Sequence, residues 1–209
     1  GELLQRCRNL IRNKQAADAL EDSENVIFAL ARIVEGRDKY TQGHVERVAA
    51  CAVEIGTRMR LGDDEVATLY RGGVIHDLGK IAVPDAILNK PGRLDDHEWS
   101  VMKTHPVVGY DVLVRLRTFH DVLGIVRWHH ERPNGRGYPD GIGGDELPLL
   151  PRIVAVADCF DAVTSARPYC QARTVNTALE VLTKGARCGD FDEDVVGVMC
   201  EMAKDSRLD

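Results

Sequence analysis

Five of the seven histidines in this chain stand where imidazole nitrogens could converge on a metal ion. His76 is followed directly by Asp77, and imidazole beside carboxylate is a common pair of metal-ligating groups. Taken singly, each histidine is more commonly a helix cap or a core residue than a ligand, and His97 and His120 are interpreted in that way. The five candidates are His44, His76, His105, His129 and His130.

The segment RGGVIHDLGK, residues 71–80, would place a third ionisable group beside this pair. If one helix runs through it, His76 and Lys80 share a face, because residues four apart lie one turn apart. Burial of an imidazole, a carboxylate and an ammonium together costs several kcal/mol unless another charge offsets it. A divalent cation would supply that charge, whereas an ordinary helix with a locally hydrogen-bonded histidine is the simpler alternative.

Two acidic residues interrupt the apolar segment RIVAVADCFDAV. Asp158 would be unstable as an ionised carboxylate inside an almost unbroken apolar helix unless it had a partner. Asp161 follows three residues later on the same helix face, where it could accept a hydrogen bond from a ligating histidine. We therefore interpret Asp158 as a ligand and Asp161 as a residue that orients one.

The five histidines, Asp77 and Asp158 make seven candidate ligands, which are too many for one ion. They suffice for two ions if Asp77 bridges them and water completes the shells. Imidazole and carboxylate ligands without thiolate suit iron, manganese, zinc or nickel. Two such ions about 3.5 to 4 Å apart are known to cleave phosphoesters by activating water and neutralising phosphate charge.

The composition is typical of one soluble domain with an aliphatic core, because 44% of the 209 residues are hydrophobic and only 5% aromatic. The net charge of -6 argues against broad binding to duplex nucleic acid. No stretch approaches the roughly 18 apolar residues of a membrane helix. Six cysteines without CxxC spacing are interpreted as reduced thiols, which predicts a cytoplasmic protein.

The elements that must position these residues are all expected to be helical. Residues 1–24 are expected to form a polar linker helix with weak coiled-coil spacing, and residues 25–209 the functional domain. The opening resembles the exit helix of a receiver domain leading into an output domain, and a plain N-terminal helix is the alternative. Further helices are expected over residues 26–34 and 44–59, and from Asp63 through HDLGK. A short helix is expected from Asp95 or Asp96 to Lys103, and another is expected to begin at Pro106. The last helices are expected over 121–131, 152–165 and 174–204, the last of them with a break at 185–190.

A Gly- and Pro-rich segment from residue 131 to 151 separates two of these helices and shows no periodicity. Loops of nearly twenty residues inside a compact domain are usually functional or disordered. Because no segment predicts a convincing strand, the expected fold class is all-α.

Five sequence motifs in order resemble those of one family, the HD-GYP domains of the HD phosphohydrolase superfamily. The resemblance covers about residues 25–204. The motifs are YTQGHVERV, HDLGKIAVPDAILNKPG, MKTHPVVGYDVL, HHERPNGRGYPDG and RIVAVADCFDAVTSARPY. It implies an all-α helical bundle and a bacterial enzyme that hydrolyses the second messenger cyclic di-GMP to pGpG; whether hydrolysis continues to GMP stays open.

The resemblance also implies how the ligands divide. One ion would be held by His44, His76, Asp77 and Asp158. The other would be held by Asp77, His105, His129 and His130. Iron is the first expectation for the metal and manganese the second, with zinc and nickel as further options, and Lys80 would lie near the scissile phosphate as a catalytic residue.

Substrate contacts are implied for the signature loop and for one arginine. Gly137, Tyr138 and Pro139 form the signature, in which the glycine permits a tight turn and the proline stiffens it. Tyr138 could present its hydroxyl or ring face to a guanine, or it could simply anchor the loop on the core. Arg167 matches a position that contacts substrate phosphate in the family.

Three residues depart from the family pattern. Tyr40 stands where some members have a glutamate associated with a third metal, which favours a two-metal centre. Cys170 stands where many members have a phosphate-binding lysine, and losing that cation would weaken binding by roughly 1 to 3 kcal/mol. Asn134 replaces a common aspartate.

Two other functions stay open at this stage. One is a dinuclear phosphohydrolase with a different nucleotide substrate, because a fold does not determine a substrate. The other is a weakly active or inactive signalling scaffold that binds nucleotide or a partner protein, which Cys170 would favour. Expected partners are cyclic di-GMP, an upstream receiver domain, diguanylate cyclase-type proteins and a second copy bound through the N-terminal helix.

Overall fold

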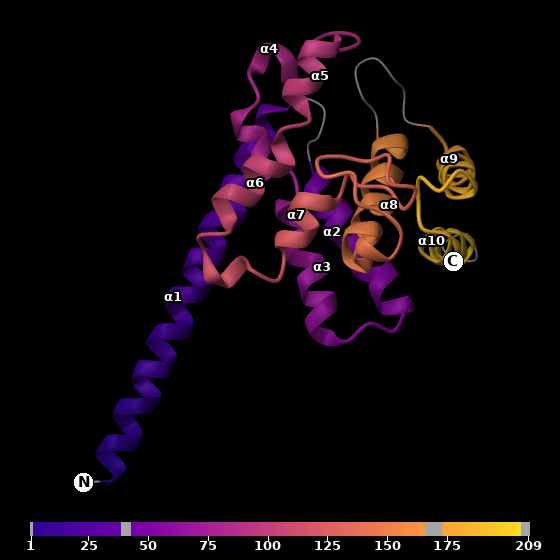
Figure 1. Ribbon diagram of the computed structural model, residues 1–209. Helices are drawn as coiled ribbons and strands as arrows, with labels where there is room; N and C mark the ends of the chain where they lie inside the picture. The colour runs from indigo at the N-terminus through magenta and orange to yellow at the C-terminus, as the bar shows by residue number, and fades with distance from the viewer. Residues whose placement is uncertain (1, 39–42, 166–172, 206–209) are drawn as a thin grey trace.

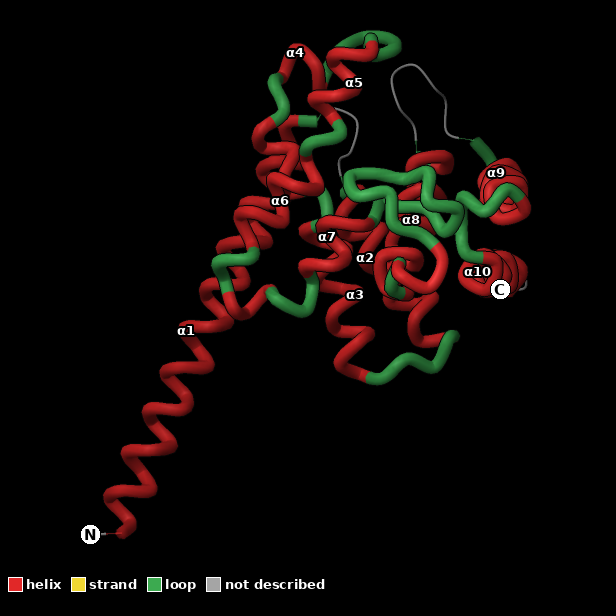
Figure 2. Tube along the Cα trace, viewed as in Figure 1, coloured by secondary structure: helices red, strands yellow, loops and turns green. Residues whose placement is uncertain are grey.

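The computed structural model describes residues 2–38, 43–165 and 173–205, and within these ranges every regular element is helical. The all-α class expected from the sequence is therefore confirmed. Figures 1 and 2 show helices joined by loops, with one long helix that extends from the body of the molecule. The helices in chain order are α1 (Glu2–Arg37), α2 (His44–Arg58), α3 (Asp63–Ile75), η1 (Leu78–Ala82), α4 (Asp85–Leu88), α5 (Asp96–Met102), α6 (His105–Leu113), η2 (Arg117–Phe119), α7 (Leu123–Trp128), η3 (Gly144–Glu146), α8 (Leu149–Thr164), α9 (Val175–Arg187) and α10 (Glu193–Asp205).

The first helix differs from its expected form. A polar helix ending near residue 24 and a second helix over 26–34 were expected, but α1 is one uninterrupted helix from Glu2 to Arg37. Its sequence holds no proline and only Gly36 near its end, so nothing breaks the backbone hydrogen bonds between the two expected helices. The domain boundary at residue 24 thus falls inside α1, and it stays a prediction.

The core lies on both sides of α2. Val48, Ala52 and Ile55 on one face of α2 pack with α8, α9 and α10, while Ala49 on another face packs with α1, α3 and α7. The apolar residues of α2 recur at three and four positions, which is the spacing that gives a helix one buried stripe. This packing sets the start of α2 beside the end of α3, where His44 and His76 lie.

A second difference from the expected helices concerns the HDLGK sequence. A helix continuing through His76 to Lys80 was expected, but α3 ends at Ile75 and a short 3₁₀ helix, η1, begins at Leu78. Gly79 of η1 lies so close to α6 that a Cβ there would be 1.9 Å from the carbonyl oxygen of His105. Only glycine permits this approach, which brings the turn at Asp77 against the start of α6.

None of the described helices is long and apolar enough to cross a membrane.

Candidate metal centre

The candidate ligands lie at the ends of helices that meet in the middle of the fold. His44 is the first residue of α2 and His105 the first of α6. His76 follows the last residue of α3, and His129 follows the last residue of α7. Helix ends carry side chains into the space between elements, so four helices contribute one imidazole each to one region.

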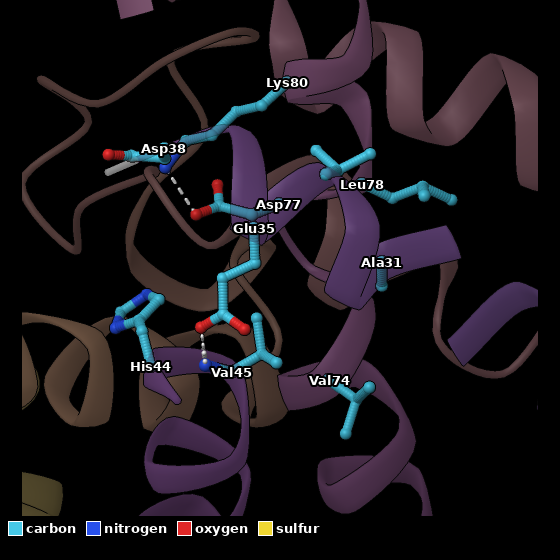
Figure 3. Close-up of a pocket in the computed structure, with 10 residues that line it drawn as sticks. Ala31, Glu35, Asp38, His44, Val45, Val74, Asp77, Leu78 and Lys80 are labelled. Atoms are coloured by element: carbon cyan, nitrogen blue, oxygen red, sulfur yellow. Dashed lines mark hydrogen bonds and ion pairs between the residues drawn. The ribbon is translucent and has the colours of Figure 1, made fainter. Parts of the chain in front are cut away.

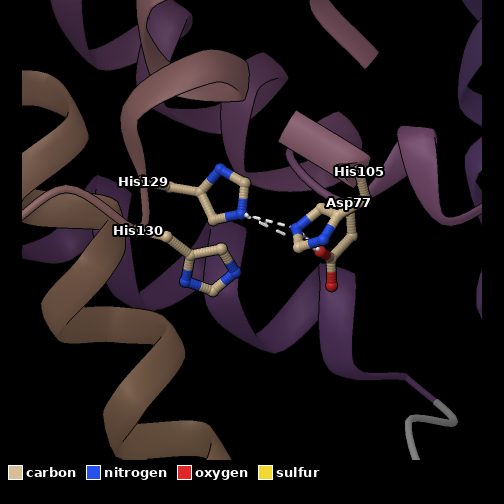
Figure 4. A group of neighbouring side chains, drawn as sticks. All are labelled: Asp77, His105, His129 and His130. Atoms are coloured by element: carbon tan, nitrogen blue, oxygen red, sulfur yellow. Dashed lines mark hydrogen bonds and ion pairs between the residues drawn. The ribbon is translucent and has the colours of Figure 1, made fainter. Parts of the chain in front are cut away.

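Asp77 lies at the centre of this region and belongs to two groups of potential ligands. One group is Asp77, His105, His129 and His130, and the other is His44, His76 and Asp77. Within each group, one ligand atom of every residue lies within 4.8 Å of the others. Figure 4 shows the first group, with the rings of His105 and His129 turned toward each other beside Asp77.

The tautomers of three imidazoles follow from their hydrogen bonds. Nδ1 of His76 lies 2.7 Å from the carbonyl oxygen of Gly73, and Nδ1 of His105 lies 2.8 Å from that of Met102. Nδ1 of His129 lies 3.0 Å from the carbonyl oxygen of Val126. A carbonyl only accepts, so each Nδ1 carries a proton, and Nε2 is the nitrogen that each ring presents to the centre as a possible metal ligand.

These Nε2 atoms and the carboxylate of Asp77 face one another. Nε2 of His105 lies 3.3 Å from Nε2 of His129 and 3.2 Å from Oδ1 of Asp77, so three potential ligand atoms crowd together. His76 Nε2 and Asp77 Oδ1 are buried without a hydrogen-bond partner among the described residues. Buried polar atoms left in this state are unfavourable, and divalent cations bound by the two groups would satisfy them. The residues therefore fit a metal.

The two acidic residues of α8 lie beside His44. Asp158 Oδ1 is 3.4 Å from His44 Nε2, although Asp158 does not join the compact group of His44, His76 and Asp77. Asp161 accepts a hydrogen bond from His44 Nδ1 at 2.7 Å, in the orienting place expected for it. Burial would raise the pKa of Asp161, but the hydrogen bonds from His44 and Arg47 outweigh it and lower that pKa to about 2.

Lys80 contacts the carboxylate of Asp77 rather than sharing a face with His76. Its Nζ lies 2.5 Å from Asp77 Oδ2, three residues away, because the 3₁₀ turn brings residues three apart into line. Burial would raise the pKa of Asp77, yet Lys80 and His76 hold it well below its usual range. For Lys80 burial acts in the lowering direction, and the Asp77 carboxylate outweighs it and raises the pKa. Both groups therefore stay charged.

The pKa values of His129 and His130 shift the other way. Burial, followed by repulsion from neighbouring histidines, lowers both well below the usual range. Neutral imidazoles are the form that binds metal. These two side chains are therefore ready to act as ligands at neutral pH.

The signature loop covers one side of the centre. The ring of Tyr138 stacks on His130 with centroids 4.7 Å apart, and the Tyr138–Pro139 peptide bond is cis. Gly137 passes so close to Glu131 that a Cβ there would lie 2.3 Å from its Cα. Tyr138 thus anchors the loop on a candidate ligand. Together with Lys80 it also lines a cleft over the metal centre.

Several residues that shape the site carried no expectation from the sequence. Glu131 is buried and accepts hydrogen bonds from the backbone nitrogens of Asp140 and Gly141, which holds the loop closed. Arg47 donates to Asp161, and its position three residues after His44 was the available signal. Glu35, near the end of α1, accepts a hydrogen bond from Val45 N beside His44, as Figure 3 shows.

The other residues singled out in the sequence lie away from the metal centre or outside the described residues. His97 and His120 are exposed, as their interpretation as ordinary histidines requires. Asn134 donates to Cys188 O and Asp190 Oδ1, so it ties the loop to the segment after α9. Tyr40, Arg167 and Cys170 lie outside the described residues.

Comparison with known proteins identifies relatives over most of the chain. The profile of the family described as "HD domain" matches residues 29–195. The "Cyclic di-GMP phosphodiesterase response regulator RpfG" of Xanthomonas campestris pv. campestris is 39% identical over 87% of this chain and 53% of its own length. The "3'3'-cGAMP-specific phosphodiesterase 3" of Vibrio cholerae is 37% identical over 87% of this chain and 40% of its own length.

A solved structure shares the fold. It is described as Bd1817, a HDG"Y"P protein from Bdellovibrio bacteriovorus, and it matches with a TM-score of 0.67 over 90% of this chain and 62% of that one. Its sequence identity is 21%, so the likeness concerns the fold alone. The chain spans about half the length or less of the two curated relatives.

Proposed function

Because this chain belongs to the HD-domain family, we propose that it is a metal-dependent phosphodiesterase that hydrolyses cyclic di-GMP to pGpG. The observation that carries the proposal is the pair of ligand groups that share Asp77. A relative at 39% identity that carries the name of a cyclic di-GMP phosphodiesterase supports this substrate. Further hydrolysis of pGpG to GMP is part of the proposal.

We propose that two divalent cations bind here, iron first and manganese second. His105, His129, His130 and Asp77 would hold one, and His44, His76, Asp77 and Asp158 the other. The absence of cysteine from both groups favours these metals over ones that prefer thiolate. When bound, such a pair supplies Lewis acidity toward phosphate oxygens and lowers the pKa of water.

The protein's own residues then position and neutralise the substrate. The Lys80 ammonium is directed into the cleft and can donate to a phosphoryl oxygen or to the leaving oxygen. Burial raises the pKa of Tyr138, so its hydroxyl stays protonated and acts as a hydrogen-bond donor rather than a base. The neutral imidazoles of His129 and His130 keep their lone pairs available to the metal.

The test loads anaerobically purified protein with iron or manganese and follows cyclic di-GMP by chromatography. We expect pGpG to appear and about two metal equivalents to be present by elemental analysis. Lys80→Ala should keep the metal but lower turnover by roughly 100- to 1,000-fold, the range for removal of one charge-stabilising donor. A metal-loaded protein that leaves cyclic di-GMP intact would contradict the proposal.

A second candidate substrate is a mixed cyclic dinucleotide. The relative named as a 3'3'-cGAMP-specific phosphodiesterase, at 37% identity, favours this alternative. Turnover of both cyclic dinucleotides side by side, as kcat/KM, separates the two. If neither is cleaved but both bind, the scaffold function stays as the explanation.

The chain's place in signalling is also a proposal. The name of one relative includes a response regulator, and α1 extends from the body as a connecting helix would (Figure 1). We infer an upstream receiver domain, an opposing diguanylate cyclase and pairing of two copies through α1. The free thiols of Cys51, Cys159, Cys188 and Cys200 in the described residues support a cytoplasmic location.

A further inference from the structure

The cleft over the metal centre has two chemically different sides. It encloses about 310 Å³. One side is polar and ionisable, with Asp77, Lys80 and His130 among its residues. The other side is apolar and is built by α4, α5 and the segment between them, with Leu88, Leu94, Trp99 and Met102. A ligand that fits both sides must combine an anionic group with an apolar one.

Helix α5 carries the largest side chain of the apolar side, yet it has no part in the core. None of its residues is buried. It is held instead by its first turn, where Asp95 accepts from Glu98 N at 2.9 Å and Glu98 accepts from Asp95 N at 2.8 Å. Lys90 adds an ion pair to Glu98. The position of Trp99 is therefore defined without being needed for packing of the fold.

Trp99 is open to a ligand. The residue is 45% exposed, and its ring lies 6.1 Å from the ring of Tyr138 in an edge contact of 78°. Tyr138 in turn stacks on His130, so one of its faces is already covered. A continuous aromatic path thus runs from a candidate metal ligand outward to Trp99, which has the greater free surface.

We propose that Trp99 is the nucleobase-stacking residue of this cleft, so that the apolar side binds the base of a nucleotide whose phosphate lies over the metal centre. Planar bases stack on indole rings through dispersion and burial of apolar surface. The side chains of Leu94 and Met102 border the same space and would contact the edge of the base. This inference deepens the proposed function and rests on it for the phosphate side alone.

The experiment uses two probes that differ in the base, GMP and ribose 5-phosphate. The chain has only two tryptophans, and Trp128, whose indole donates a 2.8 Å hydrogen bond to Asp140, is not among the described residues that line the cleft. Metal-loaded protein is titrated with each probe while tryptophan fluorescence and heat of binding are recorded. We expect GMP to quench the fluorescence and ribose 5-phosphate to leave it unchanged.

Three variants complete the test. Trp99→Ala should weaken GMP binding by roughly 10- to 100-fold, abolish the quenching and leave ribose 5-phosphate binding unchanged, since stacking contributes in that range. Trp99→Phe should keep part of the affinity for GMP while the quenching disappears. His97→Ala, on the same helix and exposed, is the matched control and should behave as the wild type.

The outcomes separate this inference from the proposed function. Quenching by GMP in a protein that does not cleave cyclic di-GMP would support the base subsite and contradict only the activity. Cleavage of cyclic di-GMP with an unchanged KM in Trp99→Ala, together with an unchanged preference for GMP over ribose 5-phosphate, would overturn the subsite. Metal content and circular dichroism of each variant verify that the fold is intact.

Discussion

The two sides of the metal centre are oriented by different means. On the His105 side, which comprises His105, His129 and His130, the first two rings hydrogen-bond to backbone carbonyls three residues earlier in the chain. On the His44 side, which comprises His44, His76, Asp158 and Asp161, the ring of His76 is also held by a local carbonyl, but the ring of His44 is oriented by a carboxylate 117 residues away. The first arrangement depends on local helix geometry, and the second depends on how α2 packs against α8.

This difference has consequences for metal binding. Local hydrogen bonds form whenever the helix end forms, so the His105 side should keep its geometry under moderate destabilisation. The His44 side needs the α2–α8 contact, and Arg47 must neutralise part of the charge on Asp161. We expect the His44 side to lose its ion first, and the following changes test that contrast.

The largest effect should come from Asp77→Ala, because Asp77 belongs to both groups of potential ligands. Loss of its carboxylate leaves imidazoles without the shared ligand, so both ions and all measurable turnover should disappear. Elemental analysis and a product assay measure the two effects. His97→Ala is the control and should retain full metal, while two equivalents in Asp77→Ala would contradict the assignment.

Substitutions confined to one side should remove one ion. His129→Ala and His44→Ala are each expected to leave about one equivalent of metal, since metal affinity follows the number of available ligands. Turnover should fall steeply in both because the chemistry needs the pair. A His44→Ala variant that still binds two equivalents would show that His44 is not a ligand.

A change behind the His44 side should act more weakly. Asp161→Ala removes the acceptor that orients His44, and loss of such a partner typically lowers metal affinity about 10- to 100-fold. In a chelator competition, the more weakly bound ion should be released at a lower chelator concentration than in the wild type. Release of the more tightly bound ion should be unchanged. Asp161→Asn keeps an acceptor oxygen and should recover part of the affinity; equal weakening of both ions would remove the contrast between the sides.

The smallest effect concerns stability and pH. Since the folded pKa of Asp161 is about 2, below its ordinary 3.8, the ionised group stabilises the folded state above pH 4, and this contribution disappears as the pH falls toward 2. The difference corresponds to about 2 kcal/mol. Urea unfolding of metal-free wild type and Asp161→Asn should therefore differ at pH 7 and converge near pH 2. A constant difference across this range would refute the linkage.

Much of the centre followed from residue types and spacing. The HD pair, the paired histidines and the acidic residues of an apolar helix are all candidates from the sequence; the structure brings the histidines together around Asp77 and places the acidic residues beside His44. Membership of the HD-domain family, which the five motifs predicted, is also confirmed. Short sequence segments suffice to identify these candidates, because an ionisable residue within an apolar segment needs a charged or polar partner wherever the segment lies in the fold.

Other features needed the tertiary structure. The sequence around Ile75 carries no strong signal for the end of α3, because a glycine such as Gly79 can also occur within a helix. The helix ends there because Gly79 lies against the carbonyl oxygen of His105 on α6. The continuity of α1 is a second such feature, because the change from polar to apolar residues predicts two helices where the structure has one. Glu131 lacked any pattern, since its partners are backbone nitrogens of a loop.

The sequence by itself determined the helical class and which side chains could act as ligands, because apolar periodicity and ionisable groups in apolar surroundings are properties of short segments. Only the tertiary structure decided that Lys80 pairs with Asp77, that His44 is the histidine Asp161 orients, and that Trp99 borders the cleft. Each of these depends on the distance between segments, and that distance results from how the helices pack.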